Sequence, residues 1–321
     1  MTTEIQTRAR RIGSRARLLG TVVLAAGAFH LVRTIWREAA EYRASDARLR
    51  TEWITIPALA GAGPLRVHAR VRDDAAATLP PIVLVHGYGI ASSYLVPLAA
   101  RLGEQARVYA PDLPGHGRSG HDARPLTVPE LAEALAAWMD ARRLRSAILV
   151  GHSMGCQIVA EAAARRPELT AGLVLLAPAS DPSARTIPRK LARALACIPF
   201  ERPSFFVLGL LDYNRTTARL LLEEMRLMLA HRVEEILPRV AGPVRVARGR
   251  WDHLAPQAWT ETVARLAGAP APDVIARWGH AVHYDDPESV AEIVLELART
   301  IPGQALQSLT KDEDINTVHP H

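Results

Sequence analysis

The sequence has few cysteines and no metal-site pattern. Cys156 and Cys197 are the only two cysteines among 321 residues, which excludes a disulfide framework and a cysteine-based metal site. We expect both to be small buried hydrophobic side chains. No cluster of His, Cys, Asp or Glu has the spacing of metal ligands. The sequence therefore predicts neither a metal nor a cofactor.

Outside its N-terminal region the chain lacks a charge excess of either sign. The net charge is +6, and residues 1–50 account for all of it with ten Arg against four acidic residues. The remaining residues carry 29 basic and 29 acidic side chains. Composition thus gives no reason to expect a nucleic-acid partner. Because 49% of the residues are hydrophobic, a sizeable core is possible.

The chain also lacks an apolar run of the roughly 20 residues that cross a bilayer comfortably. The nearest approach is residues 18–32, which are 15 residues without a charge. Extension to residue 36 lets Arg33 snorkel and Trp36 lie at the interface. We interpret residues 18–36 as a membrane anchor, which predicts a membrane-anchored protein. The alternatives are a secretory signal, or an apolar helix packed on protein, in a secreted or cytoplasmic protein.

Beyond residue 50, short apolar strands alternate with helical patterns. Two strand patterns at 53–56 and 65–71 predict an antiparallel edge. Buried strands and helices then alternate up to residue 180, and again over 241–300. This alternation predicts an α/β fold in which a mostly parallel twisted sheet is covered by helices on both faces.

The alternation stops over residues 181–240, which contain only helical patterns, at 187–197, 205–211 and 216–237. We interpret this block as a helical cap at the carboxyl edge of the sheet, where ligands bind in open α/β sheets. The predicted domains are an N-terminal basic arm and apolar helix (1–50), an α/β core (51–180 and 241–300), the cap (181–240) and a flexible polar tail (301–321).

The segment Gly151-His-Ser-Met-Gly155 follows a predicted strand and precedes a helical pattern. Gly-x-Ser-x-Gly in that context is typical of a nucleophile elbow. The two glycines leave room for a sharp turn in which Ser153 adopts a strained backbone. The turn lifts the Ser153 hydroxyl clear of the sheet, and the Met154 N–H is then available to an oxyanion.

A serine hydroxyl is a poor nucleophile without a base and a group that orients the base. Downstream of Ser153, Asp252 lies just past one predicted strand and His280 just past the next. Their loops leave the edge of the sheet where the elbow lies, so we expect the three side chains to converge. Asp181 is an alternative acid, and His283 is an alternative base.

The remaining candidates surround this predicted site. A second oxyanion donor is the Tyr88 N–H, because the small Gly87 lets that backbone approach. Apolar cap residues favour acyl, aryl or terpenoid-like substrates over sugars or charged metabolites. The candidates for the substrate pocket are His86, Gly87, His283, Phe205, Phe206 and Met225.

With these residues the chain resembles the α/β-hydrolase superfamily, in its branch with a helical cap. The resemblance spans residues 53–300 and rests on His86-Gly-Tyr-Gly89, Asp112-Leu-Pro-Gly-His-Gly-Arg-Ser119, Gly151-His-Ser-Met-Gly155, Gly249-x-x-Asp252-x-x-x-Pro256 and Gly279-His280-x-x-His283-x-Asp285-x-Pro287. It implies that Ser153 is the nucleophile, Asp252 the acid and His280 the base. A serine nucleophile argues against the dehalogenase and epoxide-hydrolase relatives, which use Asp there.

Three functions are compatible with these residues. The first is a serine hydrolase that cleaves a carboxylic ester, thioester or lactone of a largely apolar substrate through an acyl-enzyme. The second is a carbon–carbon bond hydrolase or a perhydrolase-like member of the same fold. The third is a non-catalytic, membrane-anchored binder that retains the fold.

Overall fold

The computed structural model describes residues 27–57, 63–74, 78–120, 124–213 and 218–301. The chain divides into two compact units, with the boundary between Ala44 and Ser45. A helix covers residues 27–46, so it begins in the first unit and ends just inside the second. The predicted basic arm and almost all of the predicted tail lie outside the described residues.

The predicted membrane anchor is wrong. Its first part, residues 18–26, lies outside the described residues, and its second part belongs to the helix over 27–46. That helix carries charged residues from Arg33 onwards, which interrupt its apolar character. Across the described ranges, none of the helices has both the length and the apolar character that a membrane crossing requires.

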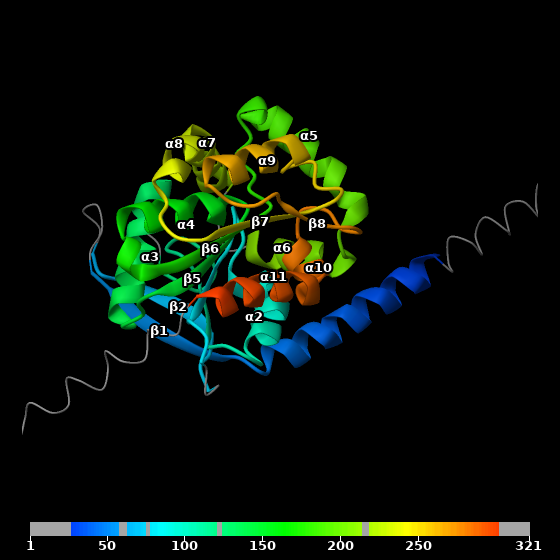
Figure 1. Cartoon of the computed structure of the whole chain (residues 1–321). Coiled ribbons are helices and arrows are strands. Elements are labelled where there is room, and N and C mark those ends of the chain that lie inside the picture. The colour runs from blue at the N-terminus through cyan, green and yellow to red at the C-terminus, as the bar shows by residue number, and fades with distance from the viewer. Residues whose placement is uncertain (1–26, 58–62, 75–77, 121–123, 214–217, 302–321) are drawn as a thin grey trace, which may run out of the picture. The chain divides into compact units, whose positions relative to one another are not determined.

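The described residues of the second unit contain one eight-stranded sheet (Figure 1) with the strand order β1-β2-β4-β3-β5-β6-β7-β8. The two pairs that include β2 are antiparallel, and all the others are parallel. The predicted antiparallel edge and mostly parallel sheet are therefore confirmed. The strands are β1 Arg50–Ile56, β2 Leu65–Arg72, β3 Ile82–Val85, β4 Val108–Pro111, β5 Ala147–His152, β6 Thr170–Leu176, β7 Val244–Gly249 and β8 Asp273–Ile275.

Helices cover both faces of this sheet because the chain reverses its direction across the strands. From β3 the chain passes through α2 to β4, whereas from β4 onwards it moves the opposite way through α3, α4 and α9. Right-handed crossovers in opposite directions place their helices on opposite faces, and α11 packs against α2. These helices are α2 Val96–Leu102, α3 Val128–Ala141, α4 Met154–Arg165, α9 Gln257–Leu266 and α11 Pro287–Thr300.

The residues between β6 and β7 form the cap. Its helices are α5 Ile187–Cys197, α6 Pro203–Tyr213, α7 Ala218–Ala230 and α8 Val233–Ile236, with short 3₁₀ turns η3 Pro182–Ala184, η4 Ile198–Phe200 and η5 Leu237–Arg239. The single helix predicted over 216–237 is wrong, because it breaks after Ala230. In a continuous helix the Met228 carbonyl would accept from the N–H of residue 232. Here it accepts instead from Gln157 Nε2 at 3.1 Å, and Arg232 leaves helical geometry.

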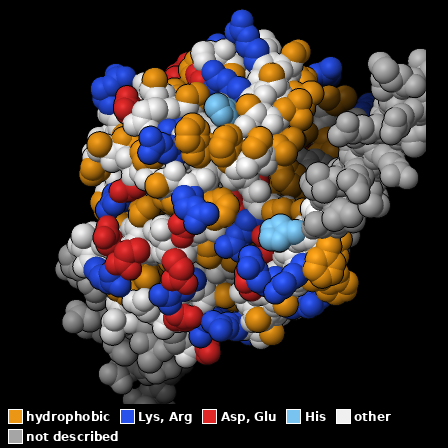
Figure 2. All heavy atoms as spheres, turned by 90° about the vertical axis from the view of Figure 1, so that its right-hand side faces the viewer, with side chains coloured by type: hydrophobic (Ala, Val, Ile, Leu, Met, Phe, Trp, Pro, Cys, Tyr) orange, Lys and Arg blue, Asp and Glu red, His pale blue; other side chains and the backbone are white. Residues whose placement is uncertain are grey.

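The outer surface of the cap is rich in exposed apolar side chains. Figure 2 shows hydrophobic side chains gathered over the upper half of one face, while its lower half is a mixture of basic and acidic side chains. The large exposed hydrophobic residues on α5, η4 and α6 are Leu191, Leu195, Ile198, Phe206, Val207 and Leu210.

Candidate active site

Ser153 lies in a sharp turn between β5 and α4. Its backbone angles, φ 55° and ψ −115°, fall in a region that residues with a side chain rarely adopt. The turn needs both neighbouring glycines. A Cβ at Gly155 would lie 2.4 Å from the Val85 carbonyl oxygen, and one at Gly151 would lie 2.5 Å from the Gly155 oxygen. The close approach of β3, β5 and α4 therefore places the serine at the carboxyl edge of the sheet.

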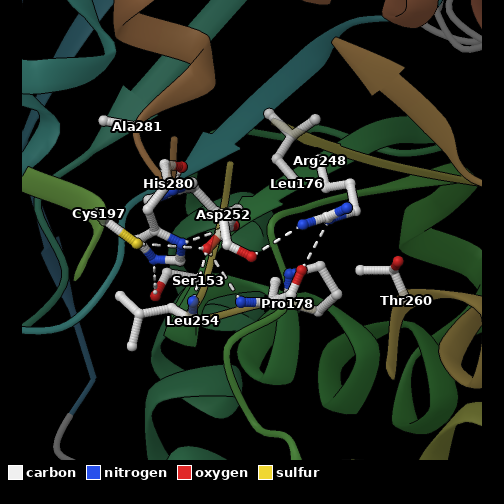
Figure 3. Close-up of polar contacts among 12 residues, drawn as sticks. Ser153, Leu176, Pro178, Cys197, Arg248, Asp252, Leu254, Thr260, His280 and Ala281 are labelled. Atoms are coloured by element: carbon white, nitrogen blue, oxygen red, sulfur yellow. Dashed lines mark hydrogen bonds and ion pairs between the residues drawn. The ribbon is translucent and has the colours of Figure 1, made fainter. Parts of the chain in front are cut away.

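His280 and Asp252 reach the same edge from the loops that follow β8 and β7. His280 Nε2 lies 2.9 Å from Ser153 Oγ, and His280 Nδ1 lies 2.9 Å from Asp252 Oδ2. Figure 3 shows the imidazole between the hydroxyl and the carboxylate. Because parallel strands end at one edge, three residues that are distant in the sequence form one hydrogen-bonded chain.

Asp252 is buried and held as a carboxylate. Its Oδ1 accepts from the N–H groups of Leu254 at 2.8 Å and Ala255 at 2.9 Å. Burial alone would raise the pKa of Asp252, but His280 and the Ala255 N–H outweigh it and lower that pKa. A carboxylate at Nδ1 requires that this nitrogen carry the proton. His280 Nε2 is then free to accept the proton of the Ser153 hydroxyl.

The alternative acid and the alternative base lie elsewhere. Asp181 Oδ1 accepts from the Ser183 N–H at 2.8 Å, and its Oδ2 accepts from Arg193 at 2.5 Å. His283 belongs to the short helix α10 Val282–Asp285. Its fully buried ring packs 4.1 Å from the ring of His152, and burial keeps its pKa well below the usual value. His280 is therefore the candidate base within hydrogen-bond distance of Ser153, and Asp252 is the candidate acid within hydrogen-bond distance of His280.

Tyr94 and His152 form a buried relay behind Ser153 that the sequence did not indicate. The Tyr94 hydroxyl accepts from the Gly87 N–H at 2.7 Å and lies 2.6 Å from His152 Nδ1. His152 Nε2 in turn lies 2.9 Å from the His280 carbonyl oxygen. Burial lowers the pKa of His152 to about 3, so its ring is neutral. The Tyr94 hydroxyl then donates its proton to His152 Nδ1, and the proton on His152 Nε2 is donated to the His280 carbonyl oxygen. Each of these two hydrogen bonds therefore has one proton.

The loop after β3 runs beside Ser153. A Cβ at Gly87 would lie 3.1 Å from Ser153 Cβ, so the small residue permits this approach. The side-chain hydroxyl of the next residue, Tyr88, donates a hydrogen bond to the Leu221 carbonyl oxygen of α7 at 2.7 Å. Met154, the residue after the serine, begins α4. The backbone positions of Tyr88 and Met154, predicted as oxyanion donors, therefore belong to the two segments that flank Ser153.

The pocket candidates occupy different environments. His86 is fully buried, and its Nε2 accepts from the Leu113 N–H at 2.9 Å, so it supports the neighbouring loop. Phe205 is half-buried, with its ring 6.3 Å from that of Tyr94. Phe206 is 40% exposed, whereas Met225 packs against the core. Within the described ranges, no group of three or more His, Cys, Asp or Glu side chains could hold a metal ion.

The sequence is similar to a family of known proteins and to an esterase. A sequence model of the alpha/beta hydrolase family matches residues 82–293. The pimeloyl-[acyl-carrier protein] methyl ester esterase of Stenotrophomonas maltophilia (strain R551-3) is 28% identical over 239 residues, which cover 66% of this chain and 90% of that protein.

Two solved structures share the fold. A bacterial membrane phospholipase A matches with a TM-score of 0.67 at 22% identity, over 89% of this chain and 99% of that chain. The enol-lactonase from Burkholderia xenovorans LB400 matches with a TM-score of 0.63 at 21% identity, over 77% of this chain and 99% of that chain. At these identities the likeness concerns the fold alone.

Proposed function

This chain belongs to the alpha/beta hydrolase family, and from that premise we propose that it is a serine hydrolase that cleaves a carboxylic ester of a largely apolar substrate. The observation that carries the proposal is the hydrogen-bonded chain from Ser153 Oγ through His280 to Asp252. The esterase activity in the name of a relative that matches two thirds of this chain adds support.

In the proposed reaction, His280 Nε2 takes the Ser153 proton while Oγ attacks the ester carbonyl carbon. Asp252 stabilises the imidazolium that forms. The N–H groups of Tyr88 and Met154 hold the negative carbonyl oxygen. His280 then protonates the leaving alkoxide, and the acyl-enzyme remains. Water, deprotonated by His280, attacks the acyl group and releases the acid, and the proton returns to Ser153.

The proposed substrate class follows from apolar side chains of the cap. Phe205, which packs near Tyr94, and Met225, which packs on the core, present apolar surface on the cap. An apolar site of this kind favours acyl or aryl groups over charged ones. Thioesters and lactones react through the same acyl-enzyme, so they belong to the same proposal.

Turnover of short p-nitrophenyl esters tests the proposal. Ser153→Ala removes the attacking oxygen, so we expect kcat to fall at least about 10³-fold. Ser289→Ala is a matched control, because Ser289 is an exposed residue in the first turn of α11 whose hydroxyl donates to Asp286 Oδ2 at 3.0 Å. Turnover by Ser153→Ala equal to that of the wild type would refute the proposal.

A further inference from the structure

A glutamate of the cap, Glu201, holds the loop that carries His280. Glu201 follows the turn η4, and its Oε1 accepts from the His280 N–H at 2.5 Å. Its Oε2 accepts from the next N–H, that of Ala281, at 3.0 Å. One cap carboxyl group therefore bridges two consecutive amides of this loop, one of them belonging to the candidate base itself.

The neighbouring backbone makes the same connection. The Gly279 N–H donates to the Phe200 carbonyl at 3.1 Å, so three successive amides of the loop bond to two successive residues of the cap. A Cβ at Gly279 would lie 2.4 Å from Glu201 Oε1. Glycine is therefore the residue that allows the carboxyl group to approach this closely.

The same segment also contacts the loop of the candidate acid. The Phe200 ring stacks on Trp251, with centroids 5.2 Å apart and an interplanar angle of 12°. Cys197 Sγ lies 3.9 Å from Asp252 Oδ1, as Figure 3 shows. Residues 197–201 of the cap thus contact both loops that follow the last two strands.

A second carboxyl group completes the contact. Asp285 acts on the Glu201 carboxyl group from the end of α10, and its Oδ1 accepts from the Arg202 N–H at 3.1 Å. A neighbouring carboxylate disfavours the charged form of a carboxyl group, and so does burial. Burial and Asp285 raise the pKa of Glu201 to about 10.

We propose that Glu201 is a positioning residue for His280: it fixes the loop backbone so that Nε2 stays in reach of Ser153 Oγ. The inference rests on the proposed serine hydrolase function. In this proposal, the turn η4 and Glu201 set the geometry of proton transfer, so the cap does more than cover the substrate. A displacement of the base by about 1 Å is enough to cost about 10²-fold in rate.

The test measures kcat and KM for a short p-nitrophenyl ester, together with thermal stability, for Glu201→Ala and Glu201→Gln in the full-length protein. We expect Glu201→Ala to lower kcat about 10- to 100-fold, with a much smaller change in KM. Glu201→Gln keeps the size of the side chain, one acceptor for a loop N–H and a donor to Asp285, so its kcat should lie between those of the wild type and the alanine variant. Glu235→Ala, an exposed glutamate of α8, is the control and should match the wild type.

Each outcome is decisive. A folded Glu201→Ala variant with wild-type kcat, or one that loses only thermal stability, overturns the inference while the proposed function stands. If the alanine variant does not fold, the glutamine variant decides: a lowered kcat with KM retained supports positioning, and a wild-type kcat refutes it. A folded wild-type protein without turnover removes the proposed function itself.

Discussion

At the scale of single residues, the proposed mechanism depends on which carboxylate faces His280. Asp252 and Asp181 both follow strands of the sheet, and the sequence leaves both open as the acid. In the structure Asp252 lies 2.9 Å from His280 Nδ1. Asp181 instead caps the turn η3 and pairs with Arg193.

Substitution of each aspartate by asparagine distinguishes them. Asp252→Asn leaves the size unchanged but favours the wrong tautomer of His280, so we expect kcat to fall by about 10⁴-fold. Asp181 bonds to Ser183 and Arg193 and not to His280, so Asp181→Asn should change kcat little. Steady-state kinetics with a p-nitrophenyl ester provide the measurement. An equal or larger loss in Asp181→Asn would reassign the acid.

The raised pKa of Glu201 predicts a pH dependence of stability. Burial and Asp285 raise the pKa of Glu201 from 4.5 to about 10, against the opposing effect of the N–H groups of His280 and Ala281. A raised pKa in the folded state means that this contribution to stability is complete below the unfolded pKa and is lost as the pH rises through the folded pKa.

Urea denaturation between about pH 5 and about pH 9 measures this dependence. The free energy of unfolding of the wild type should decline with rising pH more steeply than that of Glu201→Gln, whose amide does not titrate. Parallel curves for the two proteins would contradict the raised pKa of Glu201.

The sequence indicates some residues of the candidate site and gives no signal for others, for a physical reason. Ser153, Asp252 and His280 each follow a recognisable strand, so topology alone predicts that they converge. Tyr94 and Glu201 lie in helical or turn segments without a motif. Their contacts to His152 and to the His280 N–H join residues 58 and 79 positions apart, which no local pattern encodes.

At the scale of elements, the elbow depends on how closely α4 approaches β3. Two neighbouring glycines permit contacts between backbones that a single methyl group would prevent. The same logic explains the error over 216–237. Its hydrophobic pattern predicts one helix, but a side chain from α4, Gln157, takes the Met228 carbonyl and ends α7. Such tertiary competition for a backbone acceptor leaves no trace in hydrophobic periodicity.

Gly155→Ala tests the packing of the elbow. Its added methyl group would meet the Val85 and His86 carbonyl oxygens at 2.4 and 2.7 Å, so β3 and α4 must separate. We expect a loss of at least about 1–3 kcal/mol in the free energy of unfolding, measured by urea denaturation. Gly120→Ala is the control, because its methyl group would reach only ordinary contact at 3.6 Å. Equal stability of the two variants would contradict this account of the elbow.

At the scale of the whole molecule, the sequence predicts the fold better than it predicts membrane association. Short apolar strands that alternate with amphipathic helices allow few topologies, and the observed parallel sheet is among them. A short uncharged run next to an Arg-rich arm predicts a membrane anchor. That inference fails because a membrane crossing needs an apolar run of sufficient length, and the described helix over 27–46 carries charged residues from Arg33 onwards.

The central claim is that one activated serine performs the chemistry of the whole chain. Reaction of the purified full-length protein with a fluorophosphonate, followed by intact-mass analysis and peptide mapping, tests it most directly. The account predicts a single adduct per chain, on Ser153, that is absent from Ser153→Ala. A folded wild-type protein that stays unmodified, or that carries its adduct on another residue, would contradict it.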